Sequence, residues 1–159
     1  RYGADTASRF DFNNYDYVID CIDSLADKAL LITNATRSTA TLYSSMGAAL
    51  KLDPSRIKAA DLYKVQGGRL AAALRRKFKQ IGEYPAHKFK CVYSDEVVPN
   101  HDDAPEDATG GMTFGKVAIN GAMCHITGIF GLTLASLVIN DVIARSCQEN
   151  ELDVDEDDE

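Results

Sequence analysis

The sequence predicts an α/β fold in which helices flank a parallel or mixed sheet. Short β-rich segments alternate with segments whose apolar residues recur at helical spacing. Gly, Pro and Asp residues separate these segments at turn positions. The chain has 159 residues and 45% hydrophobic content, which suits one domain of ordinary size with a sizeable core.

Five segments have the composition of strands. The first, 15–22 (YDYVIDCI), is apolar enough for a buried parallel strand. A turn is expected at Asp53-Pro54, because Asp and Pro favour turns by side-chain bonding and by a fixed φ. The other four predicted strands are 39–46, 57–62, 89–94 and 116–120.

Three segments have features of helices. The first should begin at Ser24, because Ser24 and Asp27 have the spacing of an acidic capping box. The second follows Gly67-Gly68 and ends at Gly82. The third, 128–145, is expected to be long and buried. The predicted apolar faces consist of Leu25, Ala29, Ile32 and Ala35 in the first helix and of Leu70, Leu74, Phe78 and Ile81 in the second.

The stretch 117–140 lacks charged residues and is nominally long enough to span a bilayer. Its polar and glycine residues, among them Asn120 and Thr133, would weaken insertion. We therefore expect a buried strand, turn and helix, and no membrane partner. Within this stretch we expect Cys124 to be a buried thiol and His125 to be a hydrogen-bonded core histidine.

Charge and cysteine content argue against two kinds of site, a general nucleic-acid-binding surface and a zinc site. The formal net charge of -7 argues against a general nucleic-acid-binding surface. The run 149–159 holds eight acidic and no basic residues, so we expect a domain of residues 1–148 followed by an acidic mobile tail. The four cysteines form no C-x-x-C pair, which gives no support to a zinc site and favours reduced, cytoplasmic thiols.

The segment 20–28 (DCIDSLADK) is the strongest candidate site. Asp23 lies where the first predicted strand ends, and ligands of open α/β sheets bind beyond the carboxyl ends of the strands. A carboxylate there can hold Mg²⁺, which usually also takes phosphate oxygens and waters. The following helix N-terminus favours anions, and Lys28 lies one turn further. Alternatively, Asp23 and Ser24 only cap a helix and Lys28 is a surface charge.

A glycine-rich G-x-G-x-x-G turn, typical of nucleotide-binding α/β units, is missing from the sequence. The pair Gly110-Gly111 lies in an acidic polar loop, 97–111, and precedes no clear helix. We therefore expect either a protein that binds no nucleotide or the second half of a longer chain. The start at Arg1, within a connection, favours the second.

The segment 15–28 resembles the ubiquitin-activating-enzyme-like (HesA/MoeB/ThiF) superfamily, which includes the molybdopterin- and thiamine-biosynthesis adenylyltransferases. Those proteins carry V-x-D-x-x-D at a strand end, followed by a helix with a lysine or similar residue. In the tRNA threonylcarbamoyladenosine dehydratase branch the stretch commonly reads YDYVIDAIDS, which is similar to 15–24 here. Ser24, where the adenylyltransferases usually have Asn, and the missing C-x-x-C pairs favour the dehydratase branch.

Four further blocks resemble the dehydratase branch in the branch's own order, and the resemblance extends from about Tyr15 to Ile143. It implies the C-terminal portion of a Rossmann-like, ubiquitin-activating-enzyme-type fold. The blocks are 46–57, a glycine-rich turn followed by a DPT-x-I motif; 60–64, a D-L-x-K motif; 70–76, a PLA-x-x-LR motif with Arg69 in place of the usual Pro; and 91–96, a V-x-S-x-E motif.

The resemblance implies that Asp23 is catalytic and binds Mg-ATP, and that Ser24, Leu25 and Lys28 line the nucleotide site. ATP and Mg²⁺ would then be the cofactors, and tRNA the substrate. ATP would activate the threonine carboxylate, which closes to a cyclic product. Lys116 occupies roughly the position at which some dehydratases carry a cysteine, so no catalytic cysteine is assigned.

A basic cluster on the second helix would contact the tRNA backbone, although a solvated face is the alternative. Two other functions stay open: an adenylyltransferase that activates a ubiquitin-like sulfur carrier, with a sulfur-transfer protein as partner, and a non-catalytic dimerisation module. The family is typically dimeric, so we expect a homodimer, located in the cytoplasm. The cluster consists of Arg75, Arg76, Lys77 and Lys79.

Overall fold

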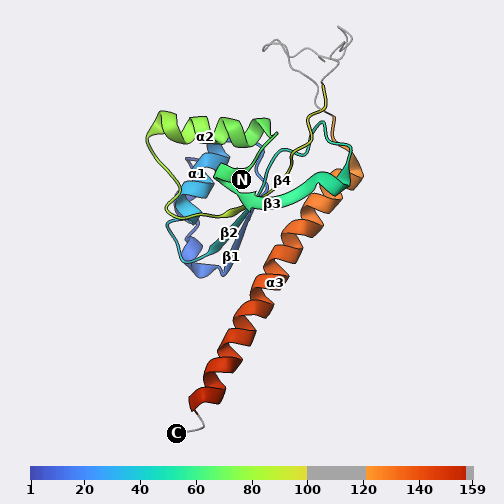
Figure 1. Cartoon of the computed structure of the whole chain (residues 1–159). Helices are drawn as coiled ribbons and strands as arrows, with labels where there is room; N and C mark the ends of the chain where they lie inside the picture. The colour runs from blue at the N-terminus through green and yellow to red at the C-terminus, as the bar shows by residue number, and fades with distance from the viewer. Residues whose placement is uncertain (100–120, 157–159) are drawn as a thin grey trace.

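The computed structural model describes residues 1–99 and 121–156, with side chains as far as Gln148. Within these residues a four-stranded sheet has the order β1-β2-β4-β3 (Figure 1). Strands β1, β2 and β4 are parallel, and β3 is antiparallel to β4. The predicted α/β fold with a mixed sheet is confirmed. The strands are β1 Tyr17–Asp20, β2 Thr41–Ser45, β3 Ile57–Asp61 and β4 Lys90–Ser94.

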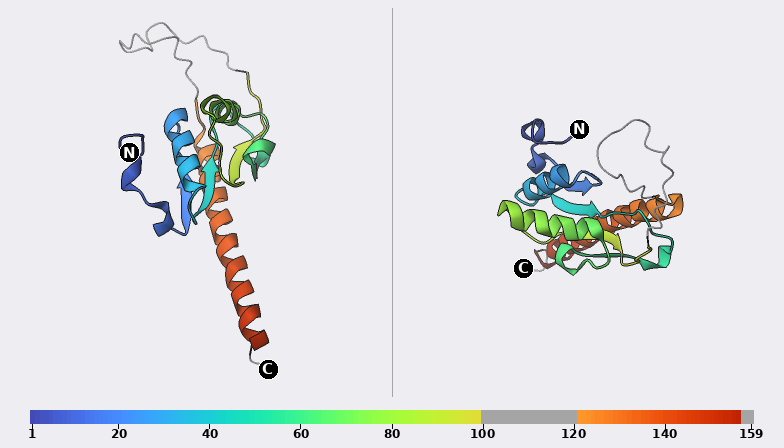
Figure 2. Two further views of the ribbon diagram at one scale, coloured as in Figure 1. Left: turned by 90° about the vertical axis from the view of Figure 1, so that its left-hand side faces the viewer. Right: turned by 90° about the horizontal axis from the view of Figure 1, so that it is seen from above.

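Helices α1 and α2 cover one face of this sheet, and α3 crosses the other face (Figures 1 and 2). The three helices are α1 Leu25–Ala35, α2 Arg69–Ile81 and α3 Cys124–Glu156. Short 3₁₀ turns occupy η1 Ala7–Arg9, η2 Phe12–Asn14, η3 Pro54–Arg56 and η4 Leu62–Lys64.

The two faces have separate cores because successive strand side chains point to opposite sides. Leu42 and Cys91 belong to the cluster under α1 and α2, whereas their neighbours Tyr43 and Val92 pack with α3. Leu42, Cys91 and Val92 are each at most 1% exposed. Both faces of the two central strands are therefore buried, as in other α/β sheets.

Helix α2 follows its sequence prediction closely. Leu74 and Phe78 are fully buried, and Gly82 ends the helix with a φ of 70°, which a side chain would strain. Ile81 is instead 42% exposed, so the packed face stops one turn before the helix ends.

The start of α1 differs from its prediction. Ser24 is the N-cap residue, but its side chain makes no capping hydrogen bond, so the predicted capping box is wrong. The Ser24 carbonyl accepts the Lys28 N–H, and Asp27 lies 4.0 Å from the Arg1 guanidinium. β1 also differs, because it is an edge strand of the described sheet and only Val18 and Asp20 are buried in it.

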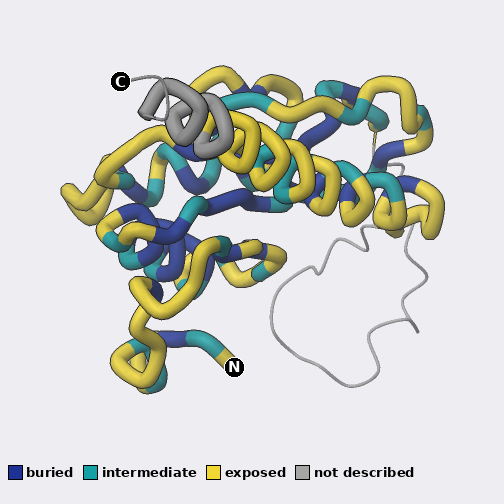
Figure 3. Tube along the Cα trace, turned by 90° about the horizontal axis from the view of Figure 1, so that it is seen from below, coloured by how far each residue is buried: buried dark blue, intermediate teal, exposed yellow. Residues whose placement is uncertain are grey.

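Helix α3 is longer and far more exposed than predicted (Figure 3). Its buried side chains are Ile126, Phe130 and Leu134, whereas Leu132 and Ile139 are 71% and 57% exposed. The prediction of a buried helix is therefore wrong within this chain. Hydropathy identified an apolar surface but could not identify what covers it. One stretch, Cys124–Gln148, is long and apolar enough to cross a membrane, which alone is weak evidence for a span.

Two expectations for individual side chains of α3 change with this exposure. Cys124 is exposed rather than buried, because it starts the helix beyond the residues that pack on the sheet. His125 is also exposed, although a ring nitrogen is hydrogen-bonded to the Leu52 carbonyl at 3.1 Å. It is thus a hydrogen-bonded histidine outside the core.

Several predicted segments lie outside the described residues. They include the strand 116–120, Lys116, the pair Gly110-Gly111 and all but the first three residues of the loop 97–111. The backbone of α3 continues as helix to Glu156, within the run predicted to be an acidic tail. The mobility of that run stays a prediction.

Candidate functional site

The candidate site lies at the edge of the sheet where the three parallel strands end. Because β1, β2 and β4 run in the same direction, the residues that follow them emerge at one edge. Asp23 follows β1, Gly47 follows β2, and Glu96 follows β4. The topology therefore brings together three motifs that lie far apart in the sequence.

Asp23 occupies the short connection between β1 and α1. Its side chain is exposed, and none of the ion pairs among the described residues includes it. Ser24 is also exposed, and Leu25 is half-buried. The structure therefore leaves the Asp23 carboxylate accessible at the strand end, as the sequence pattern predicts.

Lys28 is placed differently from the expected phosphate contact. Its side chain is fully buried, and its Nζ lies 2.7 Å from Oδ2 of Asp20, which is fully buried as well. The ammonium also donates to the carbonyls of Ile22 (3.1 Å) and Ser45 (2.7 Å). These three partners match the three N–H donors of a lysine ammonium. Direct contact between Lys28 and nucleotide stays a prediction, and in this structure the ammonium faces protein acceptors.

Two cysteines near this edge are poor nucleophiles. Cys21 is exposed as a residue, but partial desolvation of its thiol, and then the neighbouring Asp20 carboxylate, raise its pKa. Burial raises the pKa of Cys91 to about 12. Both thiols are therefore protonated at neutral pH, and a protonated thiol is a weak nucleophile.

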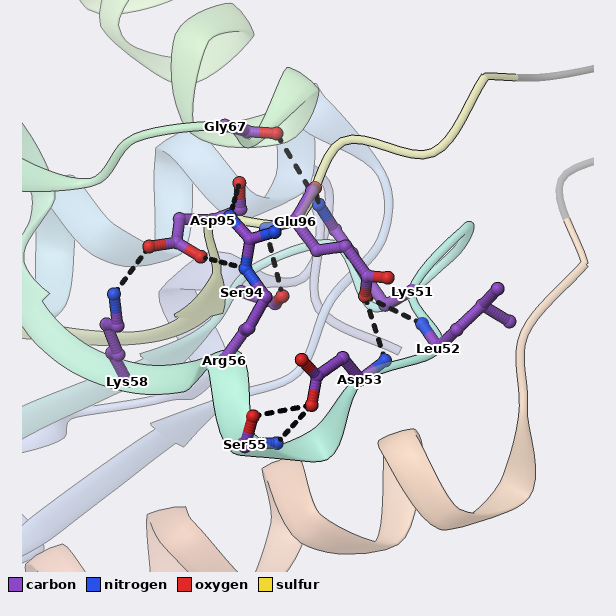
Figure 4. Close-up of polar contacts among 10 residues, drawn as sticks. All are labelled: Lys51, Leu52, Asp53, Ser55, Arg56, Lys58, Gly67, Ser94, Asp95 and Glu96. Atoms are coloured by element: carbon purple, nitrogen blue, oxygen red, sulfur yellow. Dashed lines mark hydrogen bonds and ion pairs between the residues drawn. The ribbon is translucent and has the colours of Figure 1, made fainter.

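A second set of contacts fastens the end of β4 to the turn before η3 (Figure 4). The Glu96 carboxylate accepts the backbone N–H groups of Leu52 at 2.7 Å and Asp53 at 3.0 Å. These two bonds, that of Asp53 first, lower the pKa of Glu96. The Asp53 carboxylate in turn accepts the Ser55 N–H at 2.9 Å and caps η3. The glycine-rich turn block and the V-x-S-x-E block thus form one unit.

Charged side chains strengthen the same unit (Figure 4). The Arg56 guanidinium donates to the Asp95 carboxylate at 2.8 Å, and the Lys58 ammonium pairs with its other oxygen. Lys58 and then Arg56 lower the pKa of Asp95 to about 2. The Lys51 ammonium, only 6% exposed as a residue, donates to the Glu96 carbonyl, and its burial lowers its pKa.

A cavity of about 190 Å³ lies beside this unit. Gly67 borders it with a φ of 69°, and a Cβ there would lie 2.6 Å from the Asp95 carbonyl oxygen, so only glycine fits. The lining of the cavity of about 190 Å³ includes Gly47, Lys51, Gly68, Arg69, Leu70 and Glu96. A separate hollow of about 400 Å³ lies at the opposite end of the sheet, where β2 and β4 begin.

The predicted tRNA contacts on α2 divide into two kinds. The Arg75 guanidinium donates to the carbonyls of Leu62 (2.9 Å) and Val65 (3.2 Å), so it holds the chain around η4. Arg76 and Lys79 are exposed, and Lys77 is half-buried. Arg76, Lys77 and Lys79 are thus accessible to solvent at least in part. Among the described residues, these three side chains make no hydrogen bond of the kind that Arg75 makes.

The role of Asp20 was not predicted from the sequence. An acidic residue on the same strand face as Val18 points into the core, and such a charge needs a buried partner. That signal was available in the pattern YVID, but it could not identify Lys28 as the partner. Within the described residues, no group of three or more His, Cys, Asp or Glu side chains is arranged to hold a metal ion.

Comparison with known proteins finds relatives that share one name. No family model matches the chain. The tRNA threonylcarbamoyladenosine dehydratase of Escherichia coli is 31% identical over 156 residues, which cover 91% of this chain and 58% of that protein. The Haemophilus influenzae protein of the same name is 32% identical over 138 residues, covering 82% of this chain and 52% of that protein. The chain thus spans about half the length of these bacterial relatives.

Solved structures agree with these similarities. The E. coli dehydratase TcdA in complex with ATP matches with a TM-score of 0.72 and 28% identity, over 92% of this chain and 56% of that one. Its complex with AMP matches equally well, with a TM-score of 0.72. The sheet described above is therefore part of a fold of the ThiF/MoeB type. By sequence and by fold, the chain is therefore similar to the tRNA threonylcarbamoyladenosine dehydratases.

Proposed function

We propose that this chain supplies part of the ATP site of an enzyme that dehydrates threonylcarbamoyladenosine in tRNA to a cyclic product. One observation carries the proposal: an accessible carboxylate, Asp23, lies at the C-terminal end of β1, in a chain that is similar to a dehydratase solved with ATP. Ligands of open α/β sheets bind at this edge.

Asp23 fits the role of a partial magnesium ligand. The described residues offer no complete metal site of their own, but Mg²⁺ bound to ATP takes most of its ligands from phosphates and water. One accessible carboxylate is then a sufficient contribution from this side of the site. When bound, Mg²⁺ would neutralise negative charge on the phosphates. Ser24 and Leu25, which follow Asp23 directly, would line the nucleotide pocket.

The reaction requires activation of a carboxylate. An oxygen of the threonine carboxylate attacks the α-phosphorus of ATP, the bond to the β-phosphate breaks, and pyrophosphate leaves. The carbamoyl group of the same nucleoside then attacks the activated carbonyl carbon, which forms the ring bond, releases a proton and expels AMP. Because the carbamoyl group and the activated carboxylate belong to one bound nucleoside, ring closure is favoured over attack by water.

The exposed basic residues of α2 suit a sequence-independent contact with the substrate backbone. Arg76 and Lys79 are exposed and Lys77 is half-exposed, so their charges can pair with phosphates. A second copy of the chain is the proposed partner of α3, whose apolar side chains Leu132 and Ile139 are exposed here. We place the protein in the cytoplasm.

The test is ATP-dependent dehydration of threonylcarbamoyladenosine-containing tRNA by the full-length protein. We expect AMP, pyrophosphate and the cyclic nucleoside in equal amounts, and a sharp loss of turnover in the Asp23→Asn variant. Unchanged turnover in that variant would remove Asp23 from the site. Pyrophosphate exchange stimulated by a sulfur-carrier protein and not by the tRNA would indicate an adenylyltransferase, and absence of ATP binding would indicate a non-catalytic module.

A further inference from the structure

The connection between β1 and α1 is closed by a buried ion pair. Asp20 is the last residue of β1, Lys28 lies in the first turn of α1, and the charged atoms are 2.7 Å apart. Both side chains have 0% exposure. The Ser44 hydroxyl donates to the same Asp20 oxygen at 2.6 Å, which attaches the pair to β2.

The pair binds both backbone groups of Ile22. The Ile22 N–H donates to Asp20 Oδ1 at 3.0 Å, and the Ile22 carbonyl accepts from Lys28 Nζ at 3.1 Å. Ile22 immediately precedes Asp23. The path of the connection is therefore fixed one residue before the exposed carboxylate, and Lys28 extends the attachment to the Ser45 carbonyl at the end of β2.

The usual device for shaping a helix start is missing here. An N-cap serine normally accepts an N–H of the first turn through its side chain, but Ser24 makes no such bond. Two apolar side chains could fill the volume of the ion pair without the desolvation that buried charges require. They could not, however, bind the N–H and the carbonyl of Ile22 together.

We propose that Asp20 and Lys28 are positioning residues that hold Asp23 in its productive place at the strand end. This inference rests on the proposed function of Asp23. Lys28 thereby acts through the backbone of the connection and contacts no nucleotide. Misplacement of a reacting or binding group by about 1 Å can reduce a rate on the order of 100-fold, so loss of the pair should lower kcat by about that factor.

The test uses the full-length protein and a double variant, Asp20→Asn with Lys28→Met. Removing both charges avoids leaving one charge buried alone, so the variant should fold, and thermal unfolding checks this. The matched control neutralises an exposed ion pair, Arg37→Met with Glu83→Gln, whose charged atoms lie 3.6 Å apart on the surface.

The first readout follows the geometry of the connection. The Ile22 N–H donates to Asp20 Oδ1, and Lys28 Nζ binds the Ile22 carbonyl. Amide hydrogen exchange at Ile22 should become at least about tenfold faster in the double variant and remain unchanged within α2, because local opening of the connection controls this exchange. An unchanged rate at Ile22 would overturn the proposal, whatever the enzyme's activity.

The second readout is a double-mutant cycle with Asp23→Asn, measured as ATP-dependent dehydration. We expect the Asp20/Lys28 variant to lose kcat roughly 100-fold, with the KM for ATP raised no more than in Asp23→Asn, and Asp23→Asn to have little further effect in it. A full additional effect of Asp23→Asn would show that the pair does not position Asp23 and would overturn the proposal. An inactive parent protein, or a silent Asp23→Asn in it, would instead contradict the proposed function and the positioning role together, while amide exchange at Ile22 reports separately on the connection.

Discussion

The β1–α1 connection and the exposed face of α3 differ in which kind of side chain they bury. In the connection, the charged Asp20 and Lys28 are fully buried. On α3, the apolar Leu132 and Ile139 are 71% and 57% exposed. Partners rather than polarity decide the outcome in both places, because the buried charges have each other and the backbone of Ile22. The connection is complete within the chain, whereas the α3 surface is where a further partner is expected.

Removal of one of the buried charges should have the largest effect on stability. Lys28→Met leaves the Asp20 carboxylate buried without its counter-ion, which should lower the free energy of unfolding by about 3–5 kcal/mol. Urea denaturation measures the loss. Adding Asp20→Asn should recover most of it. A single variant as stable as the parent would mean that the ion pair does not hold the connection.

The two sides of α3 offer an internal comparison. Phe130 is 2% exposed and packs with Tyr43 and Val92, so Phe130→Ala should destabilise the fold by about 3–5 kcal/mol. Leu132→Ala, on the exposed side, should change the stability of a dilute monomer by less than about 0.5 kcal/mol.

The dependence of Tm on protein concentration tests whether a second copy covers α3. If a second copy covers Leu132, the parent's Tm should rise with protein concentration, and Leu132→Ser should abolish that rise. Light scattering should give the mass of a dimer for the parent. A concentration-independent Tm with the mass of a monomer would contradict the dimer. Binding to lipid vesicles by the monomer would point to a membrane surface instead.

A smaller, pH-dependent effect is expected at Glu96. Backbone N–H donors lower its pKa in the folded state, so its contribution to stability is present above the unfolded pKa and is lost as pH falls through the folded pKa. Glu96→Gln should therefore lower Tm near pH 7, and the difference from the parent should narrow below about pH 4.

Glu83→Gln is the matched control for this pH series, because it changes an exposed glutamate in a surface ion pair with its charged atoms 3.6 Å apart. Thermal unfolding at several pH values measures both variants. A difference for Glu96→Gln that stays constant across the series would contradict an ionised Glu96 in the turn.

Local signals in the sequence were enough for most of the fold. Period and turn chemistry identified β2, β3, β4 and α2, because those signals reside in neighbouring residues. The strand-end position of Asp23 also followed, since a strand and the helix after it were both recognisable. The order of the family motifs pointed to the same superfamily that the comparisons support.

Long-range partners could not be deduced in the same way. The burial of Lys28 depends on β1 pairing with β2, and the Glu96 bonds join residues more than 40 positions apart in the sequence. The exposure of α3 escaped prediction for a related reason. An apolar helix has the same sequence pattern whether it packs on its own sheet or on another surface.

Calorimetric titration of the full-length protein with ATP, with and without Mg²⁺, measures whether Asp23 belongs to the nucleotide site. We expect Asp23→Asn to weaken binding roughly tenfold or more when Mg²⁺ is present, equivalent to about 1.4 kcal/mol, and to have little effect without it. Asp16→Asn, an exposed acid just before β1, should bind like the parent in both conditions. Equal affinities of the parent and Asp23→Asn in Mg²⁺ would contradict the placement of this carboxylate in the nucleotide site.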